Sequence, residues 1–206
     1  MYLNCGANQL TMEESFEKYL SINTGIPENE IHVLTHQILK KDISKGTLLL
    51  REGEICSKIF FVEKGLLRIY TIDSNGKEHI IQFSPENWWF SDRGSLYFEE
   101  PSDYFVEAIE DSRVVFLEKE LFDFGGPNND LIRSFNDKLL NNHIRQLQKR
   151  INLLLSATAE QRYLNFVKIY PDIMLRVPQW MIASYLGITP EGLSRVRREL
   201  ARHNRS

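Results

Sequence analysis

Two short helices joined by a tight turn are predicted by VPQWMIASYLGITPEGLSRVRRELAR, residues 177–202. Pro178 suits the first position of a helix, and Gly187 suits the left-handed residue that ends one. Thr189 can accept hydrogen bonds from first-turn amides as an N-cap, and Pro190 sets φ for a second helix that begins at once. Helix, glycine-containing turn and helix is a pattern that places a second helix in the major groove of DNA.

The second of these helices has two different sides. Leu193, Val196 and Leu200 recur at steps of three and four and predict a buried stripe. Polar side chains cover the rest, and a simply solvated, charged terminal helix is the alternative to a DNA-binding one. Eight residues at the helix start and on its polar side are candidate DNA-binding residues: Thr189, Pro190, Glu191, Ser194, Arg195, Arg197, Arg198 and Arg202.

The same stretch resembles the DNA-binding helices of the Crp/Fnr family of bacterial transcription regulators. The family pattern A-x-x-x-G-x-[ST]-x-E-x-[LV]-[SG]-R is matched by Ala183, Gly187, Thr189, Glu191, Leu193, Ser194 and Arg195. The resemblance implies that Glu191 and Arg195 contact bases. We expect Arg195 to donate to a guanine edge and Glu191 to accept from a cytosine amino group. The remaining arginines and Thr189 are expected to hold phosphates. Pro190 departs from the better-known members, so the operator need not match theirs.

Composition and charge fit a protein that meets DNA at one end. The chain has 206 residues, 42% of them apolar and 26% charged, which is typical of a globular protein with room for two small domains. Residues 176–206 carry a charge of about +4 and the rest about −7. No export signal or membrane-spanning run is visible, so we expect a cytoplasmic protein. Cys5 and Cys56 are too few for a disulfide framework or an iron–sulfur cluster.

Short apolar runs separated by glycines predict antiparallel strands between residues 43 and 117. The expected strands are Thr47–Leu50, Ile59–Val62, Leu66–Tyr70, His79–Phe83, Phe105–Ile109 and Arg113–Leu117, with turns at Gly46, Gly53, Gly65 and Gly76. Asp73-Ser-Asn-Gly76 is a strong hairpin signal. The block resembles the cyclic-nucleotide-binding β-roll of the same family, whose recurrent turns are matched by REGE at 51–54 and VEKG at 62–65.

Residues 90–104 occupy the place of the ligand cassette of such rolls. Cyclic-nucleotide-binding members carry G-E-[LI] and then R-[ST] there, and the Arg pairs with the phosphate. This chain has Ser91-Asp92 and Ser102-Asp103 instead, and a second carboxylate beside a phosphate would repel it. We therefore expect an unidentified small-molecule effector or none, not cAMP. The candidate pocket residues are Ser91, Asp92, Arg93, Ser102, Asp103 and Tyr104, and the aromatic side chains nearby could be core or pocket lining.

Helices are predicted on both sides of the strands. Thr11–Glu14 is a capping box for a helix through Leu20, and residues 27–39 form a second helix. After a Gly/Pro/Asn break at 125–129, residues 130–155 predict one long helix. Its apolar residues follow a heptad seam, which favours a helix pair over packing on its own domain: Leu140, Ile144, Leu147, Ile151 and Leu154. The resemblance implies that this helix forms the dimer.

The C-terminal part is expected to be a winged helix-turn-helix. Thr158 and Gln161 form a capping box for a helix to about residue 169, and residues 174–178 leave room for a minimal β element. The predicted fold is α+β: N-terminal helices and an antiparallel β-roll (1–126), a dimerisation helix (127–155) and a winged helix-turn-helix (156–206).

The predicted function is sequence-specific regulation of transcription by a homodimer that binds double-stranded DNA, with RNA polymerase as a further partner. A ligand-sensing module that acts through protein partners is the alternative. The sequence shows no nucleophile elbow or phosphate loop, and its histidines are scattered, so we expect no enzyme, no resident metal and no cofactor.

Overall fold

The computed structural model of the chain describes residues 15–36, 38–122 and 129–203. It divides the chain into two compact units. The first comprises the residues up to Ile69 together with Phe83–His143, and the second comprises Tyr70–Gln82 together with the residues from Ile144 onward. The second unit therefore groups the β-hairpin around residues 70–82 with the C-terminal helices.

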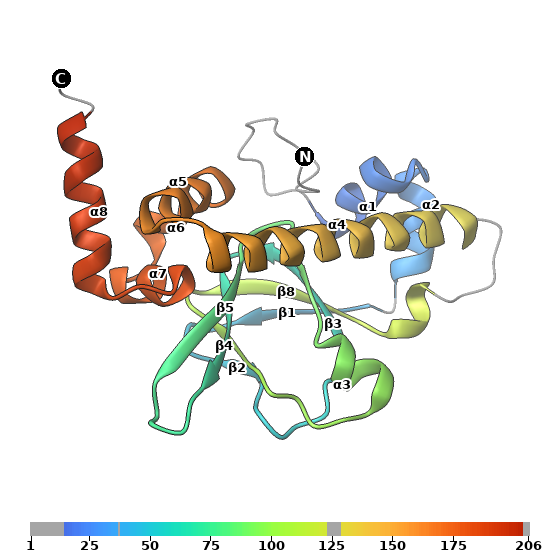
Figure 1. Cartoon of the computed structure of the whole chain (residues 1–206). Coiled ribbons are helices and arrows are strands. Elements are labelled where there is room, and N and C mark those ends of the chain that lie inside the picture. The colour runs from blue at the N-terminus through green and yellow to red at the C-terminus, as the bar shows by residue number, and fades with distance from the viewer. Residues whose placement is uncertain (1–14, 37, 123–128, 204–206) are drawn as a thin grey trace. The chain divides into compact units, whose positions relative to one another are not determined.

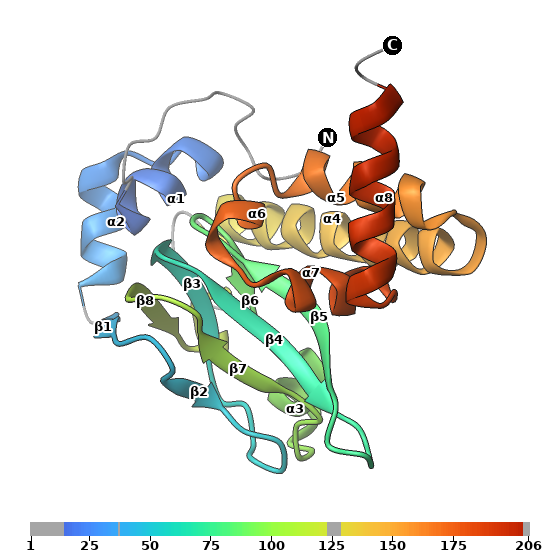
Figure 2. The same cartoon turned by 90° about the vertical axis from the view of Figure 1, so that its left-hand side faces the viewer.

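Two four-stranded sheets make up the predicted β-roll (Figure 1). Their orders are β1-β8-β3-β6 and β2-β7-β4-β5, and the paired strands β1/β8, β3/β8, β3/β6 and β2/β7 are antiparallel. Figure 2 shows the second sheet nearly face-on. The strands are β1 (Leu39–Ile43), β2 (Leu48–Leu50), β3 (Ile59–Lys64), β4 (Leu67–Ile72), β5 (Glu78–Ser84), β6 (Trp89–Phe90), β7 (Phe105–Ala108) and β8 (Ser112–Leu117).

Glycines end the strands where the sequence predicts turns. All four predicted turn glycines have φ between +79° and +94°, a region that side chains with a Cβ rarely adopt. Gly65 has a second constraint, because a Cβ built there would lie 2.2 Å from Ser112 Oγ. In the hairpin between β4 and β5, Asp73 Oδ1 accepts from the amides of Asn75 and Lys77. These turn predictions are confirmed.

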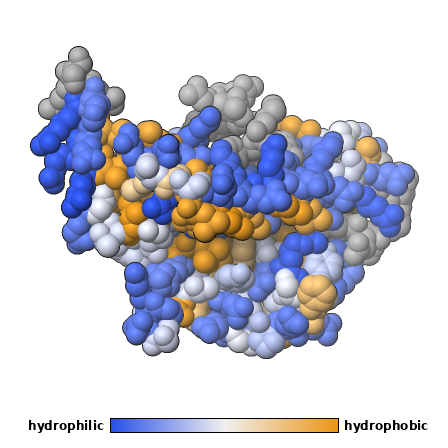
Figure 3. All heavy atoms as spheres, in the orientation of Figure 1, coloured by the Kyte–Doolittle hydropathy of each residue, from blue (hydrophilic) through white to orange (hydrophobic). Residues whose placement is uncertain are grey.

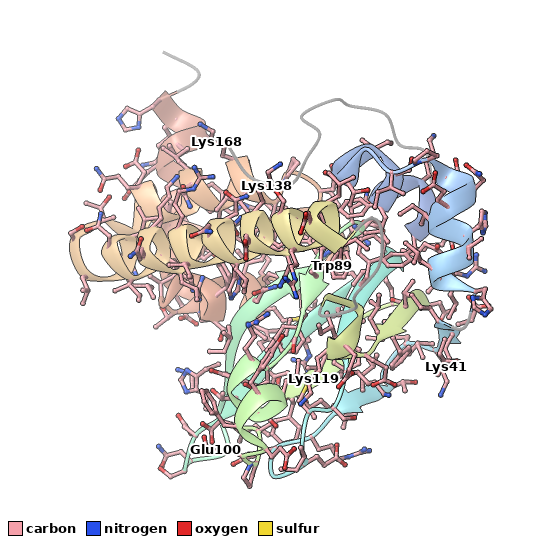
Figure 4. The ribbon with its side chains drawn as sticks, turned by 90° about the vertical axis from the view of Figure 1, so that its right-hand side faces the viewer. Lys41, Trp89, Glu100, Lys119, Lys138 and Lys168 are labelled. Atoms are coloured by element: carbon pink, nitrogen blue, oxygen red, sulfur yellow. The ribbon has the colours of Figure 1, made fainter. Side chains whose placement is uncertain are left out.

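An aromatic cluster forms the core where helices cover the first sheet. The ring centroids of Phe16 and Phe61 are 5.1 Å apart, those of Tyr19 and Phe61 are 4.8 Å apart, and those of Trp89 and Phe135 are 5.9 Å apart. Figure 4 shows Trp89 between the strands and the overlying helix α4 (Asn129–Ser156). The aromatic residues of the cassette region therefore divide between two roles, since Trp89 is core whereas Phe98 is 74% exposed.

The N-terminal helices differ in length from the prediction. Helix α1 (Phe16–Thr24) begins after Ser15, whose Oγ accepts from Lys18 N–H; the capping box predicted at 11–14 lies outside the described residues. Helix α2 (Glu28–Thr35) is shorter than the predicted 27–39, which was wrong at its C-terminal end because Leu39 pairs with Phe116 in β1. Buried Glu17 of α1 is joined to β1 by Lys40.

Every regular element that the structure describes after residue 128 is a helix. Helix α4 is followed by α5 (Ala159–Ile169), α6 (Ile173–Arg176), α7 (Gln179–Leu186) and α8 (Pro190–His203). The capping box before α5 is confirmed, since Gln161 N–H donates to Thr158 Oγ1 and Thr158 N–H donates to Gln161 Oε1. The minimal β element expected at 174–178 is wrong. Val177 N–H donates to the Ile173 carbonyl and closes helix α6 instead, so the expected wing is absent from residues 129–203.

None of the described helices combines the length and the apolar composition that a bilayer crossing requires.

Candidate nucleic-acid interface

The turn between α7 and α8 is built as its sequence predicts. Gly187 has φ +65°, and the amides of Gly187 and Ile188 donate to the carbonyls of Ser184 and Ala183, which closes α7. Two residues later Thr189 Oγ1 accepts from the amide of Gly192 at 3.1 Å. The left-handed glycine and the N-cap together fix the angle at which α8 leaves α7.

A small apolar core holds α8 against α5 and α7. Leu193 is fully buried and Val196 nearly so, as the stripe in the sequence predicts. They share this core with Ile182 and Leu186 of α7 and with Phe166 of α5, all at most 2% exposed. Because one side of α8 is committed to the core, its other side faces solvent.

All eight candidate DNA-binding residues lie on that solvent-facing side or at the start of α8. Figure 3 shows α8 covered by hydrophilic side chains on its outer side. Arg195, Arg198 and Arg202 follow at steps of three and four, so they form one row along the helix, whereas Arg197 lies beside the buried stripe. The exposed set is Thr189, Pro190, Glu191, Ser194, Arg195, Arg197, Arg198 and Arg202.

Glu191 lies in the first turn of α8, before the arginine row, and its carboxylate is an ionised hydrogen-bond acceptor. The pKa of its carboxyl group is lowered by a hydrogen bond from its own backbone amide and by another from the Thr189 hydroxyl group. The positive end of the α8 dipole favours the same ionised form. An exposed carboxylate held at a helix start can accept a hydrogen bond from a base amino group.

Arg162 of α5 supports the turn, a role that no local sequence pattern indicates. Its Nη1 donates to the carbonyl of Leu186 at 2.6 Å, and Leu186 is the last residue of α7. A cation at a helix C-terminus satisfies a carbonyl that the helix leaves unpaired and opposes the negative end of its dipole. The turn is therefore closed from outside as well as by its own backbone.

In the β-roll the structure brings Asp92, Ser102 and Tyr104 together. Asp92 precedes α3 (Arg93–Phe98), a helix that was not predicted, and Asp92 Oδ1 accepts from Ser95 N–H at 3.2 Å. Its Oδ2 accepts from Ser102 Oγ at 2.8 Å, and Ser102 Oγ in turn accepts from Tyr104 N–H. Asp92 is the N-cap of α3 and accepts from the amide of Ser95, three residues later. An Asp at this position is a helix-start signal from which α3 could have been predicted.

The other cassette residues point to a negative rather than a positive site. Burial raises the pKa of Tyr104, and the charges of Asp92 and Asp103 raise it further. Arg93 is directed elsewhere, with its guanidinium carbon 4.5 Å from the centre of the Tyr97 ring; Figure 4 labels Lys119, a second cation near that ring. A phosphate at the start of α3 would meet the Asp92 carboxylate and be repelled by it.

The heptad seam of α4 is uncovered along most of its length. Ile144, Leu147, Ile151 and Leu154 are 41–56% exposed, and only Leu140 is half-buried. Figure 3 shows hydrophobic side chains running along α4 beside hydrophilic ones. The described residues therefore leave about half of each of these four side chains exposed, which favours a partner helix over packing of α4 wholly on its own domain.

Among the described residues no group of three or more His, Cys, Asp or Glu side chains is arranged to hold a metal ion.

Comparison with known proteins gives matches over both units. A family model, the cyclic nucleotide-binding domain, matches residues 40–124, which include strands β2 to β8 and all but the first residue of β1. The anaerobic regulatory protein of Pasteurella multocida is 26% identical over 189 residues, covering 86% of this chain and 68% of that protein. The fumarate and nitrate reduction regulatory protein of Escherichia coli is 28% identical over 191 residues, covering 86% of this chain and 75% of that protein.

The solved structure of FixK2 from Bradyrhizobium japonicum shares the fold, with a TM-score of 0.64 at 20% identity over 81% of this chain and 86% of that one. The alignments with these regulatory proteins cover 86% of this chain and so extend well beyond the roll, whereas the cyclic nucleotide-binding match identifies the roll itself. The chain is therefore similar to transcription regulators of the Crp/Fnr type, and its residues 40–124 match the cyclic nucleotide-binding domain.

Proposed function

We propose that this chain binds operator DNA as a homodimer, with α8 of each subunit in the major groove. The observation that carries the proposal is the row of exposed arginines on α8, opposite a side that is committed to the core. DNA is a polyanion, and a row of guanidinium groups on one helix can contact both its phosphates and its guanine edges. Such a protein acts where the chromosome is, so we place it in the cytoplasm, and we propose no enzymatic role.

Arg195 and Glu191 are the proposed base readers. They occupy the first two turns of α8, the part of a recognition helix that reaches deepest into the groove. Arg195 would donate to guanine O6 and N7, and the ionised Glu191 would accept from a cytosine amino group. Arg197 lies on the flank and Arg202 near the end of α8, positions suited to phosphates, and Arg198 and Thr189 would also hold the backbone.

The exposed seam of α4 supports the dimer. One helix-turn-helix reads only a few base pairs, whereas two copies related by a dyad read half-sites about 34 Å apart. Ile144, Leu147, Ile151 and Leu154 are spaced to pair with the same residues of a second copy. RNA polymerase is the expected partner of the DNA-bound dimer.

The roll is proposed to hold the effector, if one acts, and this effector is not cAMP. Asp92 occupies the start of α3 and is bonded to Ser102, so the cassette presents a carboxylate where a cyclic phosphate would need donors. A ligand that is neutral or cationic on this side would avoid the repulsion. Ser91, Arg93, Asp103 and Tyr104 remain the other candidate contacts.

Operator selection from randomised duplexes, followed by salt-titrated gel shifts, tests the proposal. We expect a palindromic consensus and a logarithmic affinity that falls linearly with the logarithm of salt concentration. The double variant Arg195→Ala/Arg198→Ala serves as the matched protein control, since both residues are exposed and the fold should survive. Recovery of no consensus by the dimeric wild-type protein would instead favour a module that works through protein partners.

A further inference from the structure

We propose that the β4–β5 hairpin is a working part of the DNA-reading unit, held to α7 by two positioning residues, Ser184 and Arg150. The inference rests on the proposed function, because it concerns how the reading helices are set for two half-sites. Neither residue belongs to the exposed arginine row of α8, and both lie in the second unit together with the hairpin.

Ser184 takes the place of a neighbouring strand on β5. Strand β5 ends the order β2-β7-β4-β5, so no strand within residues 15–36, 38–122 and 129–203 pairs with its outer edge. The amide of Ile80 donates to Ser184 Oγ at 2.9 Å, and Ser184 Oγ donates to the carbonyl of Glu78 at 3.2 Å. Ile80 is 2% exposed, so its amide would otherwise be buried without a partner. One hydroxyl group on α7 thereby satisfies a donor and an acceptor of the hairpin.

Arg150 of α4 also connects the hairpin to α7. Its Nη2 donates to the carbonyl of Ile80 at 3.3 Å and to the carbonyl of Tyr185 at 3.0 Å. Its guanidinium carbon lies 3.7 Å from the centre of the Tyr185 ring, a stacking distance. A planar, multiply donating group is required for this set of contacts, and an ammonium group cannot reproduce it.

The contacts fall at the end of α7 that leads into the turn. Ser184 and Tyr185 come immediately before Leu186 and Gly187. The turn at Gly187 then determines the direction in which α8 leaves α7. Tyr185 is also packed against Phe166 of α5, at 5.3 Å between ring centroids. The hairpin, the end of α4 and the helix-turn-helix therefore form one framework, in which the hairpin and Arg150 set the angle between α4 and the reading helices.

This framework makes a prediction about spacing between half-sites. If α4 pairs with its dimer mate, the angle between α4 and α7 determines how far apart the two copies of α8 lie. Ser184→Ala removes both hydrogen bonds to the hairpin, and Arg150→Lys retains the charge but loses the fork and the stacking. Each should loosen the angle without changing α8 itself. Ser156→Ala is the matched control, because among the described residues Ser156 Oγ bonds to Asn152 of its own helix and not to the hairpin.

The experiment compares gel shifts of the full-length protein on three kinds of duplex. One carries the selected operator, a second carries the operator with one base pair added to or removed from its centre, and a third carries a single half-site. We expect Ser184→Ala and Arg150→Lys to lose about tenfold in affinity for the selected operator. We expect them to discriminate less between spacings, while single half-site affinity stays within about twofold of wild type. An unchanged spacing profile, or an equal loss on single half-sites, overturns the proposal.

Amide hydrogen exchange in the absence of DNA separates this inference from the proposed function. The Ile80 amide should exchange faster in Ser184→Ala than in the wild type, while the amides within α8 exchange as before. If the wild-type protein binds no duplex, the proposed function fails. The role of Ser184 in holding the hairpin is then decided by the exchange rate of Ile80 alone, and an unchanged rate overturns it.

Discussion

Arg162 lies so close to Gly187 that a Cβ built on the glycine would be 3.3 Å from Arg162 Nη1 and 3.4 Å from Leu154 Cδ2. Gly187 also has φ +65°, so conformation and space both favour glycine at this turn. We expect Gly187→Ala to lower the free energy of unfolding by about 1–2 kcal/mol. Urea unfolding followed by circular dichroism measures the change.

Gly192 provides the matched control for that substitution. It lies inside α8, where a Cβ would meet only ordinary contacts, the nearest at 3.5 Å. Gly192→Ala should therefore stabilise the protein by about 0.5–1 kcal/mol, because alanine is the better helix former. Equal effects of the two substitutions would show that the turn does not require glycine.

Arg162 itself should matter for stability and not only for charge. Arg162→Met removes the 2.6 Å hydrogen bond to the Leu186 carbonyl and should lower the free energy of unfolding by about 1 kcal/mol. This loss of stability is smaller than for an arginine whose donors are all bonded. Arg162 Nε is buried and makes no hydrogen bond to the described residues, so removing it also removes an unfavourable burial. Arg162→Lys, measured in the same way, should recover part of it. A Met variant as stable as wild type would remove Arg162 from the account of the turn.

Two arginines of α8 should differ in what they contribute to DNA binding. Arg195→Ala should lower discrimination at one base pair by about 1–3 kcal/mol, since the contact is to a base edge. Arg202→Ala should weaken binding to all sequences alike and reduce the salt slope by about one. Competition gel shifts with single-base operator variants at several salt concentrations measure both quantities. Equal effects of the two changes on specific and random DNA would contradict the division of roles.

The ion pairs of Lys40 should control the response of stability to acid. Burial raises the pKa of Glu17, but the hydrogen bond from Lys40, a backbone amide and the positive charges of Lys40 and His32 outweigh it and leave the pKa lowered from 4.5. This stabilisation is complete above pH 4.5 and is lost as the pH falls through the lower, folded-state value. Wild-type stability should therefore fall below about pH 4.5, as measured by urea unfolding across a pH series.

Lys40→Met should reverse that response. Glu17 would then be buried without its hydrogen-bonded cation, so the pKa of its carboxyl group would rise, and stability would increase as the pH falls. At neutral pH we expect a loss of about 2 kcal/mol, less than for a fully buried pair because a third of the Lys40 side chain is exposed. Glu17→Gln/Lys40→Met should be less destabilised than Lys40→Met alone. An unchanged acid response in Lys40→Met would exclude this triad as its source.

The cassette of the roll should be insensitive to cAMP and sensitive to loss of its own hydrogen bonds. Ser102→Ala removes the hydroxyl group that joins Asp92 Oδ2 to Tyr104 N–H, at a site 1% exposed, and should cost about 1–3 kcal/mol. Thermal unfolding with and without millimolar cAMP should give the same Tm for the wild type, because a phosphate would face the Asp92 carboxylate. A rise in Tm with cAMP would show that the cassette rearranges to accept the anion.

The sequence was most informative where a single residue determines the local backbone. Gly187, Thr189 and the Asn75-Gly76 turn act within a few residues, so the helix-turn-helix and the hairpin could be predicted closely. Strand β1 was missed, because Lys40 and Lys41 break the apolar pattern and the strand is defined by pairing with β8. Helix α6 replaced an expected β element because four residues carry too little pattern to distinguish the two.

The candidate sites followed the same division. The exposed side of α8 could be read from helical periodicity, whereas the roles of Arg162, Arg150 and Ser184 could not. Each of these three makes contacts at least 24 positions away in the sequence, and no local pattern reports a hydrogen bond across such a separation. Asp92 was assigned to the right segment, but its bond to Ser102 depends on how α3 folds.

The uncovered apolar side of α4 makes the proposed regulator dependent on its own abundance. Ile144, Leu147, Ile151 and Leu154 are exposed on a single chain, so dilution shifts the pairing equilibrium toward separate subunits by mass action. A single subunit can bind only one half-site, and its exposed apolar side chains are accessible to proteases and chaperones. The rate of synthesis would then act as a second input to transcription, independent of any small molecule in the roll.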